Sequence, residues 1–179
     1  EFYGWLISTP ESNSPYYYPY WRFNNDKLTT IEDNAHDKHV KHNTDISTQD
    51  AIGFINRNKD NPFFLYLAFD APHEPYIIDN TTWYDDESWS MNTKRYASLI
   101  THMDAAIGRL LKELDRLNLR KNTLVIFASD NGAAVQAPLA ELKCNASLRG
   151  RKGMLYEGGI RVPLIVNQPG KVPARKLTN

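Results

Sequence analysis

The sequence predicts an α/β fold in which helices cover a sheet, giving three layers. Helical and strand-like patterns alternate along residues 46–179, which is the cadence of such folds. The apolar runs 63–69 and 124–128 show no alternation of polar and apolar residues, so both faces of each strand should be covered, as in a parallel sheet flanked by helices. A long amphipathic helical pattern lies between the two runs.

The composition is that of an ordinary folded domain. Apolar residues make up 41% and charged residues 23%, and 21 basic and 21 acidic side chains give a formal net charge of zero. This balance creates no global field toward nucleic acid or an anionic membrane, so neither is expected as a partner. No apolar run is long enough to span a bilayer. The chain opens on Glu1 without a signal-peptide pattern, and we expect an upstream part to be missing.

Residues 1–45 differ from the rest of the chain. The aromatic run 16–21 is interrupted by Pro19 and has neither a helical nor a strand period. Because aromatic side chains at this density rarely stay in water, we expect an ordered, loop-rich segment packed on a larger body.

Three histidines follow at a spacing of three residues, at His36, His39 and His42. On one face of a helix they could bind a metal ion. No carboxylate or cysteine at ligand spacing completes the set, so a solvated polar turn is the favoured interpretation.

The first helix is expected from Ser47 to about Asn58. Ser47 and Asp50 resemble a capping box, and the turn-forming cluster at 59–62 ends the pattern. An apolar stripe supports this helix, formed by Ala51, Ile52 and Ile55.

The strongest helical pattern follows a polar excursion at 74–92. Seven apolar residues recur at alternating intervals of four and three, which predicts a core-facing stripe on a helix of about seven turns. They are Tyr96, Ile100, Met103, Ile107, Leu110, Leu114 and Leu117. Residues 124–128 then predict a second buried strand. Residues 161–166 predict a third, with Pro163 marking a strand start or a sheet edge.

Polar clusters follow the first two predicted strands, where open α/β sheets bind ligands. His73 has a proline close on either side, which suits a side chain held at a set angle. Asp130 and Asn131 offer one charged and one neutral oxygen, ligands that suit Ca²⁺ or Mg²⁺ rather than zinc. A loop histidine without a role and a plain Asp-Asn-Gly turn are the respective alternatives.

A third cluster concentrates positive charge. Arg149, Arg151 and Lys152 lie within four residues, beside glycines, and make a candidate anion site. A basic surface loop is the alternative that spacing leaves open.

These clusters belong to four motifs that follow one another along the chain: Pro72-His73-Glu74-Pro75, Ser129-Asp130-Asn131-Gly132, Arg149-Gly150-Arg151-Lys152 and Glu157-Gly158-Gly159 through Pro163. The ordered set resembles the sulfatase family of the alkaline-phosphatase superfamily, and nearly the whole chain participates. Within the family the likeness is greatest to the arylsulfatase B subgroup, the N-acetylgalactosamine 4-sulfatases. The implied fold is part of an alkaline-phosphatase-like three-layer sandwich, with 1–45 as the loop-rich segment and 46–179 as the α/β core portion.

The resemblance implies a sulfuric ester hydrolase with a formylglycine nucleophile and a bound Ca²⁺, with Mg²⁺ as the alternative ion. Its partner would be a small sulfate ester or a sulfated glycan such as a glycosaminoglycan. Fixed cations and a metal would stabilise the negative charge that spreads over the oxygens of a sulfuryl group in transfer. Carried over to this sequence, the metal ligands are Asp130 and Asn131, the catalytic and sulfate-binding residues are His73 and Lys152, and the supporting cations are Arg149 and Arg151.

The sequence also departs from the family pattern. The formylglycine motif (Cys or Ser, any residue, Pro, any residue, Arg) is absent, because Cys144-Asn145-Ala146 does not fit it. The early aspartate pair of the calcium shell and the lysine and histidine that follow the nucleophile are absent as well. We therefore expect a missing upstream segment to supply the nucleophile, and this chain alone to be inactive.

Two other functions stay open at this point. Related superfamily members cleave phosphate or phosphonate esters, and a non-catalytic sulfoglycan-binding protein could keep the fold without the chemistry. The identity of the nucleophile discriminates among the three. Sequons predict glycosylation at Asn80 and Asn145 and, with family habit, favour a lysosomal or secreted location. The single Cys144 excludes an internal disulfide and is interpreted as a free thiol.

Overall fold

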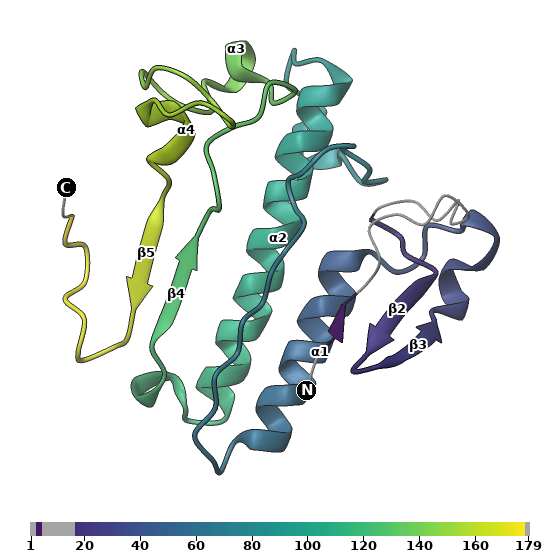
Figure 1. Cartoon of the computed structure of the whole chain (residues 1–179), viewed down its shortest axis with the longest axis vertical. Coiled ribbons are helices and arrows are strands. Elements are labelled where there is room, and N and C mark those ends of the chain that lie inside the picture. Colours follow the sequence, from purple (N-terminus) through teal and green to yellow (C-terminus); the bar gives the residue numbers. More distant parts are fainter. Residues whose placement is uncertain (1–2, 5–16, 178–179) are drawn as a thin grey trace. The chain divides into compact units, whose positions relative to one another are not determined.

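The chain divides into two units, Glu1–Leu110 and Leu111–Asn179, and each is described by itself. The structure is a computed structural model, and it describes residues 3–4 and 17–177 (Figure 1). Tyr16 of the aromatic run lies outside the described residues. No described helix combines the length and the apolar character needed to cross a membrane.

A three-stranded antiparallel sheet opens the first unit, with strand order β1-β2-β3. Its strands are β1 (Tyr3–Gly4), β2 (Trp21–Asn24) and β3 (Lys27–Thr30). Asn25 turns the chain between β2 and β3 with φ +55°, a left-handed conformation that asparagine tolerates better than most residues. These strands were not predicted, because the residues of β2 and β3 do not alternate between buried and exposed positions.

Helix α1 (Asn43–Asn58) ends where the sequence predicts but begins at Asn43 rather than Ser47. Its N-cap is His42, whose Nδ1 accepts a hydrogen bond from the Thr44 backbone N–H at 3.2 Å. The predicted capping box at Ser47 is therefore wrong. Imidazole is not among the side chains that usually cap helices, so the sequence rules for helix starts pass over it.

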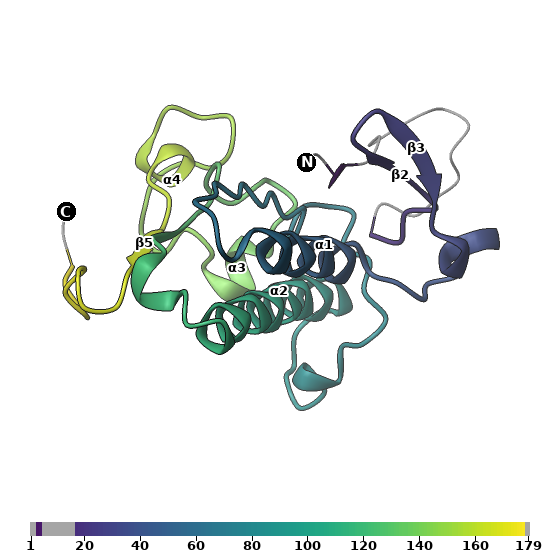
Figure 2. The ribbon, with the colours of Figure 1, turned by 90° about the horizontal axis from the view of Figure 1, so that it is seen from below.

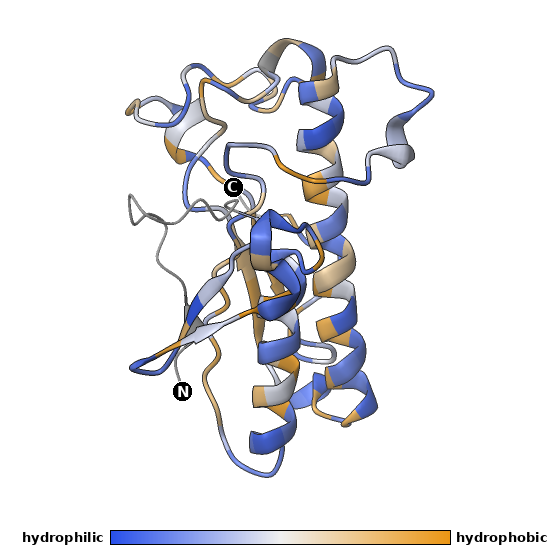
Figure 3. Cartoon of the chain, turned by 90° about the vertical axis from the view of Figure 1, so that its right-hand side faces the viewer, coloured by the Kyte–Doolittle hydropathy of each residue, from blue (hydrophilic) through white to orange (hydrophobic). Residues whose placement is uncertain are grey.

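Helix α2 (Met91–Arg116) confirms the predicted helix of about seven turns, although its buried face differs from the predicted stripe. Met103 and Leu114 of the stripe are buried, whereas Ile100 is 38% exposed. Hydrophobic and hydrophilic positions alternate along the long helix in Figure 3. The rest of its buried face consists mostly of small or polar residues, which a search for large apolar residues misses: Thr93, Ala97, Ser98, Leu99 and Ala106.

Residues 63–69 run as an extended trace and are not assigned to a strand (Figure 1). The prediction of a strand covered on both faces is wrong for the described chain, because Phe64 and Tyr66 are 87% and 81% exposed while their neighbours are half-buried. A strand needs a backbone partner for its N–H and C=O groups. Among the described residues no backbone hydrogen bond gives this segment one.

The second unit contains an antiparallel pair of strands, β4 (Val125–Ala128) and β5 (Leu164–Asn167). Strand β5 begins at Leu164, three residues after the start of the predicted run 161–166. Pro163 marks the strand start, one of the two roles expected for it, because proline has no N–H to donate to a ladder. The expected parallel pairing and full burial are not seen in the described strands, since Ile126 is 59% exposed.

The remaining helical elements are short. They are the 3₁₀ turns η1 (Glu32–Asp37), η2 (Thr82–Tyr84) and η3 (Arg120–Asn122) and the single-turn helices α3 (Leu139–Leu142) and α4 (Glu157–Ile160).

Candidate functional site

The histidine loop, residues 70–75, follows the extended segment in the first unit. The His73 backbone N–H donates to the Asp70 carbonyl oxygen at 2.8 Å and closes a turn. Nδ1 of His73 lies 2.6 Å from the Glu74 carbonyl oxygen. Because a carbonyl only accepts, Nδ1 carries the proton of this hydrogen bond. The side chain is 43% exposed, so a dissolved substrate can reach it.

Tyr17 supports the backbone of this loop. It is fully buried, and its hydroxyl donates to the His73 carbonyl oxygen at 2.7 Å, with the Asp70 carbonyl oxygen 3.3 Å away. The ring of His42 stacks on the ring of Tyr17, with centroids 5.1 Å apart. A buried phenol with its hydroxyl paired in this way fixes the backbone that carries His73.

Asp70 is the half-buried acid of the histidine loop. Its carboxylate accepts a hydrogen bond from the buried Asn43 amide. Burial raises the pKa of Asp70 to about 6, while the Asn43 hydrogen bond and the charge of His73 act to lower it. The carboxyl group beside His73 therefore titrates near neutral pH.

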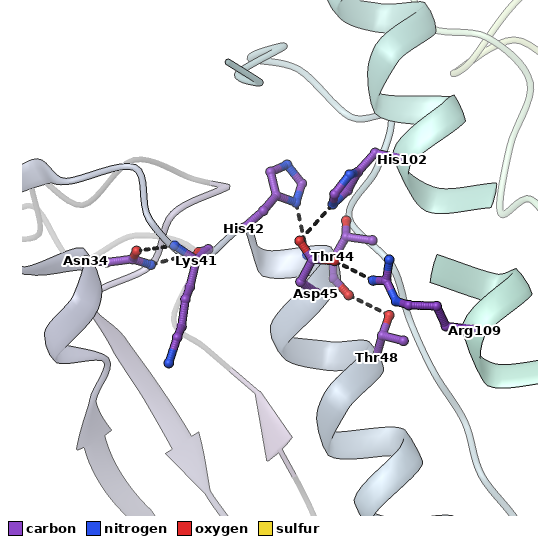
Figure 4. Close-up of polar contacts among 8 residues, drawn as sticks. All are labelled: Asn34, Lys41, His42, Thr44, Asp45, Thr48, His102 and Arg109. Carbon is purple, nitrogen blue, oxygen red and sulfur yellow. Dashed lines mark hydrogen bonds and ion pairs between the residues drawn. The ribbon is translucent and has the colours of Figure 1, made fainter. Parts of the chain in front are cut away.

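A second polar cluster joins α1 to α2 within the first unit, where the two helices run side by side (Figure 1 and Figure 2). Figure 4 shows its side chains. Asp45 accepts hydrogen bonds from Nε2 of His102, at 2.9 Å, and from the Arg109 guanidinium. Burial alone would raise the pKa of Asp45, but the His102 hydrogen bond and the two positive charges outweigh it and lower the pKa. This cluster therefore holds α1 against α2 within the first unit.

His42 lies beside this cluster and stays neutral. Burial, followed by the charge of His102, lowers the pKa of His42 to about 4. The two rings lie 4.7 Å apart. Neutrality is what the cap requires, because Nδ1 accepts from Thr44 only while it carries a lone pair.

The three histidines considered in the sequence do not form a metal site. In the described part of the chain, no three His, Cys, Asp or Glu side chains are grouped to hold a metal ion. His39 stacks on Tyr18 and contacts Asp79 at 3.1 Å, and His36 is exposed. The interpretation as a solvated turn is wrong for His42, because aromatic rings and the start of α1 bury it.

In the second unit, backbone hydrogen bonds join the Asp130 loop (129–133) to the basic loop (149–159). The Lys152 N–H donates to the Ala133 carbonyl oxygen, and the Gly132 N–H donates to the Gly159 carbonyl oxygen, both at 3.0 Å. The structure thus brings the backbone of Lys152 beside the loop that carries Asp130 and Asn131. His73 belongs to the other unit.

Close backbone packing explains the glycines in these loops. A Cβ at Gly132 would collide with the Gly158 carbonyl oxygen, and a Cβ at Gly158 would collide with the carbonyl oxygens of Gly150 and Arg149. A side chain at Gly132 would therefore push the two loops apart, and one at Gly158 would distort the basic loop itself.

Asp130 and Asn131 fit part of a site for a hard cation. Asp130 is exposed and has no hydrogen-bond or ion-pair partner among the described residues. The Asn131 Nδ2 donates to the Gly132 carbonyl oxygen at 2.9 Å, which leaves Oδ1 as the atom able to bind a cation. One carboxylate and one amide oxygen are ligands that Ca²⁺ and Mg²⁺ accept, but Ca²⁺ takes about six to eight oxygens, so others must complete the shell.

The cations of the basic loop differ in their surroundings. The Arg149 guanidinium lies 3.9 Å from the centroid of the Tyr156 ring and donates to its hydroxyl at 2.9 Å. Arg151 is half-buried and Lys152 is exposed. Tyr156 therefore orients Arg149 at the surface of this loop.

Comparison with known proteins identifies the family. Residues 1–179 match the sequence profile of the family described as Sulfatase. The chain belongs to the sulfatase family. It is 33% identical over 138 residues to the N-acetylgalactosamine-6-sulfatase of Canis lupus familiaris, covering 76% of this chain and 26% of that one. It is 35% identical over 130 residues to an arylsulfatase of Hemicentrotus pulcherrimus, covering 72% and 22%.

A solved structure of another protein shares the fold of this chain. The crystal structure of Ps i-CgsB in complex with k-i-k-neocarrahexaose matches with a TM-score of 0.74 and 31% identity, over 86% of this chain and 32% of that one. The prediction of a partial α/β, alkaline-phosphatase-like domain is confirmed. This chain spans about a quarter of the length of the curated relatives named above. The likeness to the arylsulfatase B subgroup stays a prediction.

Sequence reasoning missed the residues that support the site. Tyr17 is one of several aromatics in its run, and Asn43 gave no local signal. Asp70 stood out only as the first residue of the polar cluster that contains His73. Asn145 did give a signal, because it lies close before the basic loop, but its sequon directed attention to glycosylation.

Proposed function

We propose that the protein containing this chain hydrolyses sulfate esters of sugars or glycans. The observation that carries the proposal is the match of the whole chain to the sulfatase family. The pairing of the Asp130 loop with the basic loop supports it, since a cation site and an anion site belong side by side in such an enzyme. A glycan substrate is supported by the names of the relatives, which include an N-acetylgalactosamine-6-sulfatase, and by the neocarrahexaose complex.

In this proposal Asp130 and Asn131 hold Ca²⁺, or Mg²⁺ as the alternative. The bound ion would neutralise the sulfate oxygens and activate the nucleophile. Lys152 pairs with the sulfate oxygens, and Arg149 and Arg151 add positive potential around them.

His73 contacts the sulfate ester in the same proposal. With its Nδ1 proton committed to Glu74, it directs Nε2 toward the ester oxygen and, when protonated, gives that oxygen a proton as the bond to sulfur breaks. The formylglycine nucleophile comes from another part of the protein, because its motif is absent from these 179 residues. A lysosomal or secreted location completes the proposal.

The test is an assay of the complete protein on matched sulfate and phosphate esters of one fluorescent phenol. We expect turnover of the sulfate ester and at least about 100-fold lower kcat/KM on the phosphate ester. Asp130→Ala should lower kcat/KM by about 1,000-fold or more and reduce the bound calcium, because the cation loses its charged ligand.

Asp115→Ala, which removes an exposed carboxylate from α2, is the matched control and should leave kcat/KM and bound calcium unchanged. Preference for the phosphate ester would favour a phosphoesterase instead. Sulfated-glycan binding without turnover would favour the non-catalytic alternative.

A further inference from the structure

Asn145 lies in a doubly turned segment between α3 and the basic loop. The Ala146 N–H donates to the Lys143 carbonyl oxygen at 2.6 Å, and the Leu148 N–H donates to the Asn145 carbonyl oxygen at 2.9 Å. Both hydrogen bonds fix the backbone on either side of Asn145. Asn145 is half-buried, and its fixed backbone places the side chain in a defined position.

The Asn145 amide bridges the two loops of the candidate site. Its Oδ1 accepts from the Ala133 N–H at 3.0 Å, and its Nδ2 donates to the Gly150 carbonyl oxygen at 3.0 Å. Ala133 lies just after the proposed cation ligand Asn131, and Gly150 lies just before Lys152. One side chain thus uses its acceptor and its donor to hold the two loops together.

The bridge works together with the backbone. The Ala133 carbonyl oxygen accepts from the Lys152 N–H, so residues 145–152 pair with both polar backbone groups of Ala133. Few side chains can replace Asn145. Aspartate keeps the acceptor but lacks the donor, and alanine lacks both.

The two sequons differ in what the folded chain does with their asparagines. Asn80 is exposed, and its Oδ1 accepts from the N–H of Thr82 at 3.1 Å and from its hydroxyl at 2.7 Å, both within its own sequon. Its Nδ2, the atom to which a glycan attaches, makes no hydrogen bond to the described residues. The Nδ2 of Asn145 is already engaged with Gly150.

We propose that Asn145 is a positioning residue that sets the spacing between the cation ligands and Lys152, and that it is not a glycan acceptor, whereas Asn80 is. The first part rests on the proposed sulfatase function for its consequence in catalysis. The inter-loop bridge and the choice of sequon are independent of that function.

The experiment uses the complete protein, secreted from eukaryotic cells, with the variants Asn145→Ala, Asn145→Asp, Ser147→Ala and Asn80→Gln. Ser147→Ala is the matched control, because it destroys the sequon and keeps Asn145. We expect Asn80→Gln alone to lose the mass of one glycan. Ser147→Ala should keep wild-type mass and activity.

Asn145→Ala should weaken calcium binding by about 10- to 100-fold, the usual effect of removing a residue that orients metal ligands. It should also lower kcat more than it raises KM, and it should speed hydrogen exchange in peptides covering 129–133 and 149–153. Asn145→Asp should lie between alanine and wild type, since the acceptor for Ala133 remains. This variant serves as the test if Asn145→Ala does not fold.

Three results would overturn the proposal. The first is loss of glycan mass in Ser147→Ala, which would make Asn145 an acceptor. The second is wild-type calcium affinity in both Asn145 variants of a protein that binds calcium. The third is unchanged hydrogen exchange in both loops. A wild-type protein that binds no calcium and cleaves no sulfate ester would refute the proposed function instead, and the exchange and mass measurements would still decide the role of Asn145.

Discussion

The two units support their candidate site residues by different means. In the first unit, buried side chains reach across the fold to hold the histidine loop. Tyr17 binds the His73 carbonyl oxygen, and Asn43 binds the Asp70 carboxylate. Each support therefore depends on one functional group, which a single conservative substitution removes.

In the second unit, contacts between backbone groups hold most of the candidate site in place. The Asp130 loop and the basic loop exchange main-chain hydrogen bonds, and Gly132 packs against the Gly158 carbonyl oxygen without room for a side chain. Asn145 is the side chain that adds to this arrangement. Main-chain contacts tolerate changes in side-chain chemistry but not added volume.

The difference has a physical origin. A flexible loop can be held by a few strong side-chain hydrogen bonds when a hydrophobic environment shields them, as around Tyr17 and Asn43. Most residues of the basic loop are at least partly exposed, so side-chain hydrogen bonds there lack that shielding. Several backbone hydrogen bonds and close packing stabilise such a loop more effectively. The two units should therefore respond to different classes of substitution.

The largest expected effect is that of added volume in the second unit. Gly132→Ala places a Cβ against the Gly158 carbonyl oxygen, which belongs to the backbone and cannot rotate away. We expect a loss of at least about 3 kcal/mol in the free energy of unfolding, together with loss of calcium binding. Chemical denaturation and calcium titration of the complete protein measure the two effects.

Gly108→Ala is the matched control in the first unit. It lies in α2, and a Cβ there meets nothing within 4 Å. Alanine should stabilise the helix by about 0.5–1 kcal/mol, because glycine loses more backbone entropy on folding. If Gly132→Ala were as well tolerated as Gly108→Ala, close packing would not hold the two loops.

The second effect is a pH dependence in the first unit. His42 has a pKa of about 4 in the folded chain and about 6.5 when unfolded. Between these values the unfolded chain binds a proton at His42 that the folded chain does not bind. The contribution of neutral His42 to the free energy of unfolding is therefore fully present above about pH 6.5 and is lost as the pH falls toward about 4. His42 by itself should contribute a loss of about 2 kcal/mol in the free energy of unfolding between pH 7 and pH 5.

Asp70 acts in the opposite direction over nearly the same range. Its raised pKa means that the folded chain binds the extra proton, so stability is gained as the pH falls through about 6. The measurement therefore compares His42→Asn with its parent in an Asp70→Asn background. Asparagine can still cap α1 but does not titrate, so the stability difference between pH 7 and pH 5 should shrink. An unchanged difference would assign the acid sensitivity to other groups.

Local signals in the sequence located much of the fold. The length of α2, the end of α1 at Asn58 and the role of Pro163 as a strand start depend on neighbouring residues, and all three are confirmed. The burial of a side chain depends on residues far along the chain, and local sequence patterns do not identify these residues. For this reason the pattern of 63–69 predicted a covered strand, whereas Phe64 and Tyr66 are exposed.

For the candidate site, the sequence located the loops but not what holds them. Asp130, Asn131 and Lys152 stand out through residue type and family resemblance. The contacts that join their loops depend on long-range geometry, as the Asn145 amide and the Gly132 packing show. His42 escaped prediction for a related reason, because its role as a buried cap depends on rings stacked around it.

The smallest expected effect is that of Tyr17→Phe, which tests most directly whether the two units hold their site residues separately. Tyr17→Phe removes one hydroxyl and leaves the ring stacked on His42, so the free energy of unfolding should fall by about 1–2 kcal/mol. The His73 carbonyl oxygen then loses its buried donor, and a small displacement of the imidazole should lower kcat by about 10-fold on a sulfate ester. Calcium affinity should not change, because the cation ligands lie on loops that the second unit holds by itself.

Tyr18→Phe is the matched control for this substitution. Tyr18 is the next residue and is also buried; its ring stacks on His39 and meets His42 edge-on, whereas Tyr17 stacks on His42. Phenylalanine at that position should leave kcat unchanged. If Tyr17→Phe weakened calcium binding as much as it lowered kcat, the supports of the two units would not be separable, and the contrast between side-chain and backbone positioning would fail.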